Sequence, residues 1–215
     1  MEAVERQAFI ASHLAVGCSA LVPDISLYLA TSLTPLWLAT EAFLQQHNMA
    51  PPYWAFAWPG SEALAHFVRL NPGLVAGKRV LDFAAGCGLA GIAAAKAGAA
   101  RVEAAEIDEL AVAAIDMNAA LNGVEIKTIC NDVVGIQGDW DVVLTGDVCY
   151  EQAMAERIMA WLRMQAKCSI ILMADPGRRY KPDDPGCKRA EYPVPTSLEL
   201  EESTCRNVVI YEVLA

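Results

Sequence analysis

The sequence predicts an α/β fold: a mostly parallel sheet with helices on both faces and an antiparallel hairpin at one edge. From Lys78 onward, short apolar runs of strand length alternate with segments of helix length, and such alternation is typical of a parallel sheet joined by right-handed crossovers. The chain then ends on two strand-like runs with no helix between them. At 215 residues, we expect one domain with an appendage, since domains hold roughly 100–200 residues.

Each element follows from a local pattern of apolar residues and breakers. The expected strands are Arg79–Phe83, Arg101–Ile107, Glu125–Cys130, Trp140–Gly146 and Cys168–Ala174. The expected helices are Leu89–Ala97, Glu109–Leu121 and Gln152–Gln165. After Asp175 the chain is rich in proline and charge. We expect the runs Thr196–Leu200 and Arg206–Leu214 to form the terminal hairpin.

The first 75 residues differ from the rest, and we divide the chain into an N-terminal extension (1–75) and a core (76–215). The extension should contain a helix, a short strand, a second helix opened by Pro35, and a third helix capped by Ser61. Their expected ranges are Glu2–Ala15, Asp24–Ala30, Leu36–His47 and Ser61–Asn71. Before the third helix, Tyr53–Trp58 holds four aromatic residues bracketed by prolines, which is unusual for an exposed loop.

Charge and composition exclude several classes of protein. The net charge of −10 argues against binding to nucleic acid or to an anionic membrane, because both require a basic face. No stretch has the roughly 20 apolar residues of a membrane span. The first residues, with two acids and one base, do not fit a signal peptide, and we expect a cytoplasmic location. The seven cysteines contain no C-x-x-C pair, and the three histidines lie apart from them, so we expect no metal.

A glycine-rich turn follows the first core strand, with Gly86, Gly88 and Gly91 in G-x-G-x-x-G spacing. This spacing alone also fits a dinucleotide. Asp82 distinguishes a dinucleotide from S-adenosylmethionine, because a carboxylate at the end of the strand would repel the pyrophosphate of a dinucleotide. The same carboxylate would attract the ammonium and sulfonium groups of S-adenosylmethionine. We therefore predict an S-adenosylmethionine site at Asp82, Gly86 and Gly88, where glycine allows close approach of the backbone.

Acidic residues at the ends of the next strands extend this site. Glu106 lies 24 residues after Asp82, close to the spacing of about 20 typical of a ribose-binding acid. Asp108 competes for that role, although it also fits as the N-cap of the following helix. Asn131 and Asp132 follow the third strand and would reach the adenine edge, but both are also ordinary turn residues.

The fourth core strand leads to the candidate catalytic residues Asp147 and Tyr150. Methyl transfer to an amine is an in-line displacement by a neutral nitrogen held about 3–3.5 Å from the methyl carbon. Asp147 could bind an incoming ammonium and accept its proton, while Tyr150 could border the channel. The alternative for Asp147 is a cap for the helix Gln152–Gln165.

Four segments together resemble the lysine methyltransferases that modify the β subunit of electron transfer flavoprotein. They are the aromatic stretch Pro51–Gly60, Gly77–Asp82 with the glycine turn, Gly146–Tyr150, and Asp175-Pro176-Gly177-Arg178. The pair Asp147 and Tyr150 looks like the Asp-x-x-Tyr motif of seven-strand protein-lysine methyltransferases. The resemblance spans roughly residues 22–178.

This resemblance implies a Rossmann-like class I methyltransferase with a seven-stranded sheet. It implies S-adenosylmethionine as cofactor, S-adenosylhomocysteine as product and no metal. Trp58 and Gly60 would line the cofactor pocket, and Asp147 with Tyr150 would form the lysine site. Ala84 stands where the family usually has glycine, and Cys149 replaces the usual aromatic residue before Tyr150.

The substrate side is less defined. We expect Tyr53, Trp54 and Arg178 to contact the substrate, which by resemblance is the β subunit of electron transfer flavoprotein. A closed pocket of Tyr53, Trp54 and Phe56 would instead favour a small-molecule N-methyltransferase of the nicotinamide type. A ribosomal-protein lysine methyltransferase and a non-catalytic binding module remain further alternatives.

Overall fold

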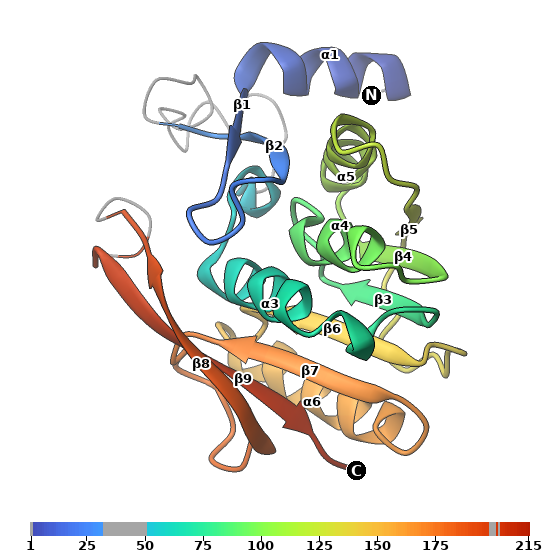
Figure 1. Cartoon of the computed structure of the whole chain (residues 1–215), viewed down its shortest axis with the longest axis vertical. Coiled ribbons are helices and arrows are strands. Elements are labelled where there is room, and N and C mark those ends of the chain that lie inside the picture. The colour runs from blue at the N-terminus through green and yellow to red at the C-terminus, as the bar shows by residue number, and fades with distance from the viewer. Residues whose placement is uncertain (1, 32–50, 198–200, 202) are drawn as a thin grey trace.

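A seven-stranded sheet with the order β5-β4-β3-β6-β7-β9-β8 forms the centre of the molecule in the computed structural model (Figure 1). The structure describes residues 2–31, 51–197, 201 and 203–215. The five strands that run parallel are β3 (Arg79–Phe83), β4 (Arg101–Glu106), β5 (Lys127–Cys130), β6 (Val142–Gly146) and β7 (Ile170–Asp175). This confirms the predicted α/β fold with its mostly parallel sheet.

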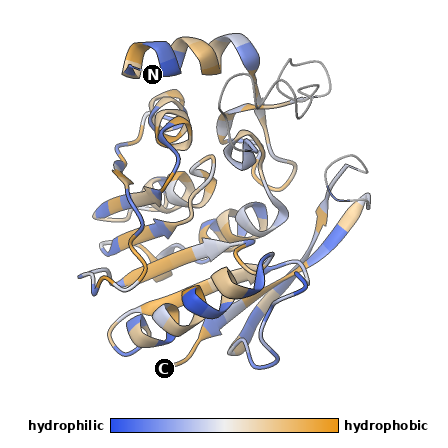
Figure 2. Ribbon diagram, turned by 180° about the vertical axis from the view of Figure 1, so that it is seen from behind, coloured by the Kyte–Doolittle hydropathy of each residue, from blue (hydrophilic) through white to orange (hydrophobic). Residues whose placement is uncertain are grey.

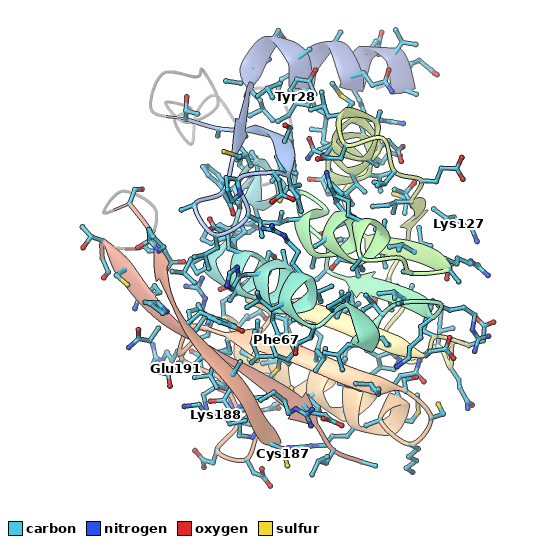
Figure 3. All side chains as sticks on the ribbon, viewed as in Figure 1. Tyr28, Phe67, Lys127, Cys187, Lys188 and Glu191 are labelled. Atoms are coloured by element: carbon cyan, nitrogen blue, oxygen red, sulfur yellow. The ribbon has the colours of Figure 1, made fainter. Side chains whose placement is uncertain are left out.

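The antiparallel edge consists of β8 (Cys187–Pro195) and β9 (Cys205–Val213), with β9 paired to β7. The predicted hairpin is confirmed, but its first strand, β8, ends before the expected run Thr196–Leu200, of which residues 198–200 lie outside the described part of the chain. β8 instead occupies the charged segment that we expected to be loop. It is an edge strand with mostly exposed side chains, so it lacks an apolar run. Figure 3 shows Lys188 and Glu191 on this strand, where they form an ion pair of 2.5 Å.

Helices cover both faces of the sheet, as predicted. On one face lie α3 (Pro59–Leu70), α4 (Leu89–Lys96) and α5 (Glu109–Leu121), while α6 (Gln152–Gln165) packs on the other. The outward side of α6 is largely hydrophilic and the strands beneath it are hydrophobic (Figure 2). Trp140 and Val133, in the connection between β5 and β6, complete the core on the α6 face.

The N-terminal part adds α1 (Ala3–His13), the hairpin of β1 (Ala15–Cys18) and β2 (Ser26–Leu29), and the short helices η1 (Tyr53–Ala55) and η2 (Pro72–Leu74). α1 lies across α5, on the side away from the terminal hairpin (Figure 1). The expected helix Leu36–His47 lies outside the described residues. No helix in the described part of the chain is long and apolar enough to cross a membrane.

α3 joins the two predicted parts of the chain. Its residues Leu64, Phe67 and Val68 share one buried cluster with β3, β6 and the terminal hairpin, although α3 belongs to the predicted extension. The boundary at residue 75 stays a prediction. Ser61 was wrong as the cap, because the helix already begins at Pro59 with Trp58 as its N-cap. Proline suits the first helical position, where its missing N–H would have had no partner in the helix.

The first turn of α3 lies directly against the end of β6, and two glycines allow this contact. A Cβ atom added to Gly146 would lie 2.9 Å from the carbonyl carbon of Gly60 and 2.9 Å from the nitrogen of Ser61. Backbone atoms cannot rotate away as a side chain can, so the helix or the strand would have to move.

We therefore predict that Gly146→Ala lowers the free energy of unfolding by about 1–3 kcal/mol, the usual cost of overpacking. Urea denaturation would measure the change. Gly17→Ala is the matched control, because a Cβ atom at Gly17 meets no heavy atom within 4 Å. Equal stability of the two variants would show that the contact at Gly146 relaxes freely.

Candidate active site

The candidate site lies where the parallel strands end, at the edge formed by the carboxyl ends of β4, β3, β6 and β7. Ligands of open α/β sheets bind at this edge, at the point where the strand order reverses. Here that point lies between β3 and β6. The glycine turn follows β3, Glu106 ends β4, and Asp147 follows β6.

Asp82 and Glu106 flank the glycine turn. Asp82 is buried, and its carboxylate accepts a hydrogen bond of 2.7 Å from the Gly91 N–H. The pKa of Asp82 is raised to about 8, mainly by burial. The hydrogen bond from Gly91 lowers this pKa, and the charge of Glu106 raises it. Glu106 accepts from the Gly86 N–H at 2.8 Å and from the Ile107 N–H at 3.1 Å. Burial also raises the pKa of Glu106.

The arrangement of these two carboxylates fits a cationic cofactor. Each oxygen of Glu106 holds one backbone N–H, and a carboxylate has about four acceptor positions, so capacity remains for ribose hydroxyls. Gly86 and Gly88 have φ values of +55° and +79°, and a Cβ atom on Gly86 would meet only the Trp54 Cα, at 4.0 Å. The backbone at Gly86 is therefore open for close approach, whereas a Cβ atom on Gly88 would lie 3.1 Å from the Ile115 side chain. A sulfonium or ammonium group would relieve the repulsion between Asp82 and Glu106.

Ala84 strains this turn. Its φ of +52° lies in the left-handed region, where a Cβ atom costs about 1–2 kcal/mol. This is the position where the family resemblance led us to expect glycine. The residue type therefore opposes the conformation that the turn adopts.

We predict that Ala84→Gly raises the free energy of unfolding by about 1 kcal/mol, because glycine removes the clash at positive φ. Ala85→Gly is the matched control: Ala85 is buried beside it without a positive φ, so the same substitution there should destabilise. Chemical denaturation of both variants tests this. Destabilisation by Ala84→Gly would show that the Ala84 methyl group contributes packing that outweighs the strain.

Asp147 is the most constrained residue of the site. Its φ is +59°, and its side chain is 9% exposed. Oδ2 accepts from the Gly60 N–H at 2.6 Å, and Oδ1 accepts from Nε and Nη2 of Arg178 at 2.9 and 2.5 Å. Burial raises the pKa of Asp147 to about 6, although Arg178 and the Gly60 N–H lower it. The alternative role of Asp147, as a cap of α6, is wrong, since the N-cap position is Glu151.

Arg178 continues the network away from Asp147. Its Nη1 and Nη2 donate to the two carboxylate oxygens of Glu201 at 3.1 and 2.6 Å. Arg206 donates to Glu201 from the other side, at 3.0 Å from Nε. The Arg178 guanidinium also lies 5.7 Å from the centre of the Trp58 ring. Sequence reasoning missed Glu201, since no motif marks it and it lies 54 residues from Asp147.

Aromatic rings border the site on the solvent side. Tyr53 and Tyr150 are each 51% exposed, and their ring centres lie 5.8 Å apart. Tyr53 also contacts Trp58 at 6.0 Å, and the Trp58 Nε1 donates to the Tyr53 carbonyl at 2.7 Å. Burial raises the pKa of the Tyr150 hydroxyl, and the charges of Tyr53 and Glu106 raise it as well.

Two more predicted residues are buried. Gly60 lies directly against Asp147, whereas Trp54 lies in a separate cluster with α1 and α5. Asn131 and Asp132 form an exposed turn in which Asp132 accepts from the Val134 N–H and pairs with Arg157. Asp108 caps α5 by accepting from the Leu110 N–H at 2.7 Å, which confirms its capping alternative. Within the described ranges, no group of three or more metal-ligand side chains is present.

Comparison with solved structures shows the fold class. The chain superimposes on a putative RNA methyltransferase from Pyrococcus horikoshii with a TM-score of 0.56 and 16% identity, over 77% of this chain and 88% of the other. Magnesium protoporphyrin IX methyltransferase from Synechocystis with bound S-adenosylhomocysteine gives 0.52 and 17%, over 72% and 81%. The chain therefore has the fold of the class I methyltransferases.

Sequence comparison gives the family. The family model of ribosomal protein L11 methyltransferase (PrmA) matches residues 65–162. The electron transfer flavoprotein beta subunit lysine methyltransferase of Danio rerio is 37% identical over 76% of this chain, and that of Xenopus laevis is 35% identical over 80%. The chain belongs to the electron transfer flavoprotein beta subunit lysine methyltransferase family. The matched part spans 64% of the Danio rerio protein and 70% of the Xenopus laevis protein.

Proposed function

We propose that this chain is an S-adenosylmethionine-dependent protein-lysine N-methyltransferase and that its substrate is the β subunit of electron transfer flavoprotein. The observation that carries the proposal is the buried carboxylate of Asp147, which directly follows the carboxyl end of β6 and stands three residues before Tyr150. An anionic group bordered by aromatic rings attracts an ammonium group. The substrate is inferred from the relatives, which are lysine methyltransferases of the electron transfer flavoprotein beta subunit.

S-adenosylmethionine, when bound, supplies an electrophilic methyl group on a sulfonium centre. In this proposal Asp82 attracts its cationic end, Glu106 accepts hydrogen bonds from its ribose, and Gly86 and Gly88 let the backbone lie close to it. Trp58 and Gly60 line the cofactor on the α3 side. Asn131 and Asp132, which follow β5 at the same edge of the sheet, border the adenine.

On the lysine side, Asp147 attracts the substrate ammonium and accepts a hydrogen bond from it, which orients the nitrogen. The nitrogen must lose its proton before it can attack, and water receives that proton while the Asp147 carboxylate stays charged. The rings of Tyr53 and Tyr150 border the aliphatic part of the lysine. Arg178 keeps Asp147 charged and fixes the direction of its lone pairs through two N–H donors.

The exposure of the rings favours a protein substrate over a small molecule. Half of each tyrosine ring, Tyr53 and Tyr150, faces solvent, and Trp54 is buried away from them. A lysine on a protein surface can reach such an open site, whereas a small aromatic substrate would need enclosing walls. The cytoplasmic location, the absence of a metal and the absence of nucleic-acid binding stay predictions.

Intact-mass measurement tests the function. Incubation with S-adenosylmethionine should add 14 Da steps, about the mass of one CH₂ each, to the flavoprotein β subunit. Ribosomal protein L11 is the comparator, because the PrmA model matches part of the chain. Modification of L11 without modification of the flavoprotein subunit would overturn the substrate assignment. Failure to modify any lysine, while S-adenosylhomocysteine still raises the melting temperature, would overturn the lysine activity.

Asp147→Asn tests the lysine site directly. We expect kcat/KM for the protein substrate to fall on the order of 100-fold, with unchanged thermal stabilisation by S-adenosylhomocysteine. The pKa of Asp147 is raised to about 6, so the carboxyl group loses its charge as pH falls through 6. Since the lysine must also be neutral, log kcat/KM should rise with slope 2 below pH 6 and slope 1 above it.

In the Asp147→Asn variant, log kcat/KM should rise with slope 1 both below and above pH 6. A wild-type profile without a break near pH 6, or a variant that retains full activity, would remove Asp147 from the lysine site.

A further inference from the structure

The ion pairs around Asp147 include a second carboxylate, Glu201, which is not needed to hold Asp147 in place. Arg178 makes two contacts with Asp147 and two with Glu201. Glu201 is one of the most buried carboxylates of the described chain, with a side chain that is 1% exposed. A carboxylate is buried at large cost unless it is paired, and Glu201 meets that cost by pairing with Arg178 and Arg206.

The position of Glu201 sets how much of the Arg178 charge reaches Asp147. Nη2 of Arg178 lies almost equally close to both carboxylates, at 2.5 Å from Asp147 Oδ1 and 2.6 Å from Glu201 Oε1. The remaining donors divide between them: Nε points to Asp147, and Nη1 points to Glu201. The guanidinium is therefore shared and neutralises neither carboxylate completely.

We propose that Glu201 is a positioning residue of the lysine site: by sharing the Arg178 guanidinium, it leaves Asp147 enough negative charge to bind a substrate ammonium. Without Glu201, the full charge of Arg178 would act on Asp147, and the site would lose its attraction for a cation. This inference rests on the proposed lysine methyltransferase function.

The surroundings of Asp147 support this role. The groups that face its carboxylate are the Gly60 N–H from α3, Arg178 from the connection after β7, and Glu201 from the segment before β9. Arg206 on β9 reaches Glu201 and not Asp147. The neighbouring Cys149 thiol stays neutral, because burial raises its pKa to about 12. Of these groups, Glu201 alone adds a negative charge, and it raises the pKa of Asp147.

Glu201→Gln is the decisive substitution, because it keeps the shape and removes the charge. We expect KM for the flavoprotein subunit to rise about tenfold, the change in affinity that corresponds to one pKa unit. We expect kcat to stay within about threefold and the affinity for S-adenosylhomocysteine to stay unchanged. Glu212→Gln is the matched control, since Glu212 pairs with Arg189 on the same hairpin at 2.7 Å and touches nothing in the site.

A titration of the Asp147 carboxyl carbon by ¹³C NMR gives a readout that needs no substrate. In Glu201→Gln the pKa of Asp147 should fall, because a neighbouring negative charge is gone, whereas Glu212→Gln should leave it unchanged. An unchanged Asp147 pKa, or an unchanged KM in an enzyme that methylates the subunit, would overturn the role of Glu201. If the wild type methylates no lysine, the proposed function fails, and the titration still decides whether Glu201 controls the charge of Asp147.

Discussion

The contact between the Asp147 carboxylate and the first turn of α3 is the constraint on which the site depends. It requires that residue 60 have no side chain, because a Cβ atom there would lie 2.3 Å from Asp147 Oδ2. It also requires that Asp147 adopt a positive φ, a strained conformation that aspartate tolerates better than most residues. Strain of this kind persists only where the surrounding contacts over-determine it.

One consequence is that three elements distant in the sequence share a single carboxylate. Gly60 lies at the start of α3, and Asp147 directly follows β6. Arg178 lies in the connection from β7 to the terminal hairpin. The Asp147 N–H also donates to the Ala174 carbonyl of β7 at 3.1 Å. The position of the Asp147 carboxylate is therefore fixed by the core of the sheet, although the rings of Tyr53 and Tyr150 lie at the surface.

The sequence predicted well what depends on local pattern and poorly what depends on distant contacts. Alternation of strands and helices predicted the sheet and all three core helices, and strand ends located Asp82, Glu106 and Asp147. It could not locate β8, because an exposed edge strand buries too few side chains to produce an apolar pattern. It could not find Glu201 either, since the pairing with Arg178 arises only when the hairpin folds back onto the sheet.

Electrostatics connects these features to the proposed reaction. The protein concentrates three buried or partly buried carboxylates, Asp82, Glu106 and Asp147, at one edge of the sheet, and burial raises the pKa of each. Such a concentration destabilises the free protein, because each charge loses water and repels the others. A cationic cofactor would relieve the repulsion between Glu106 and Asp82, and a cationic lysine would be drawn to the buried charge of Asp147. The free energy that burial of these charges costs in the free protein is recovered when the two cationic reactants bind. Of the three carboxylates, Asp147 is the one that Arg178 stabilises, and there Glu201 shares the guanidinium.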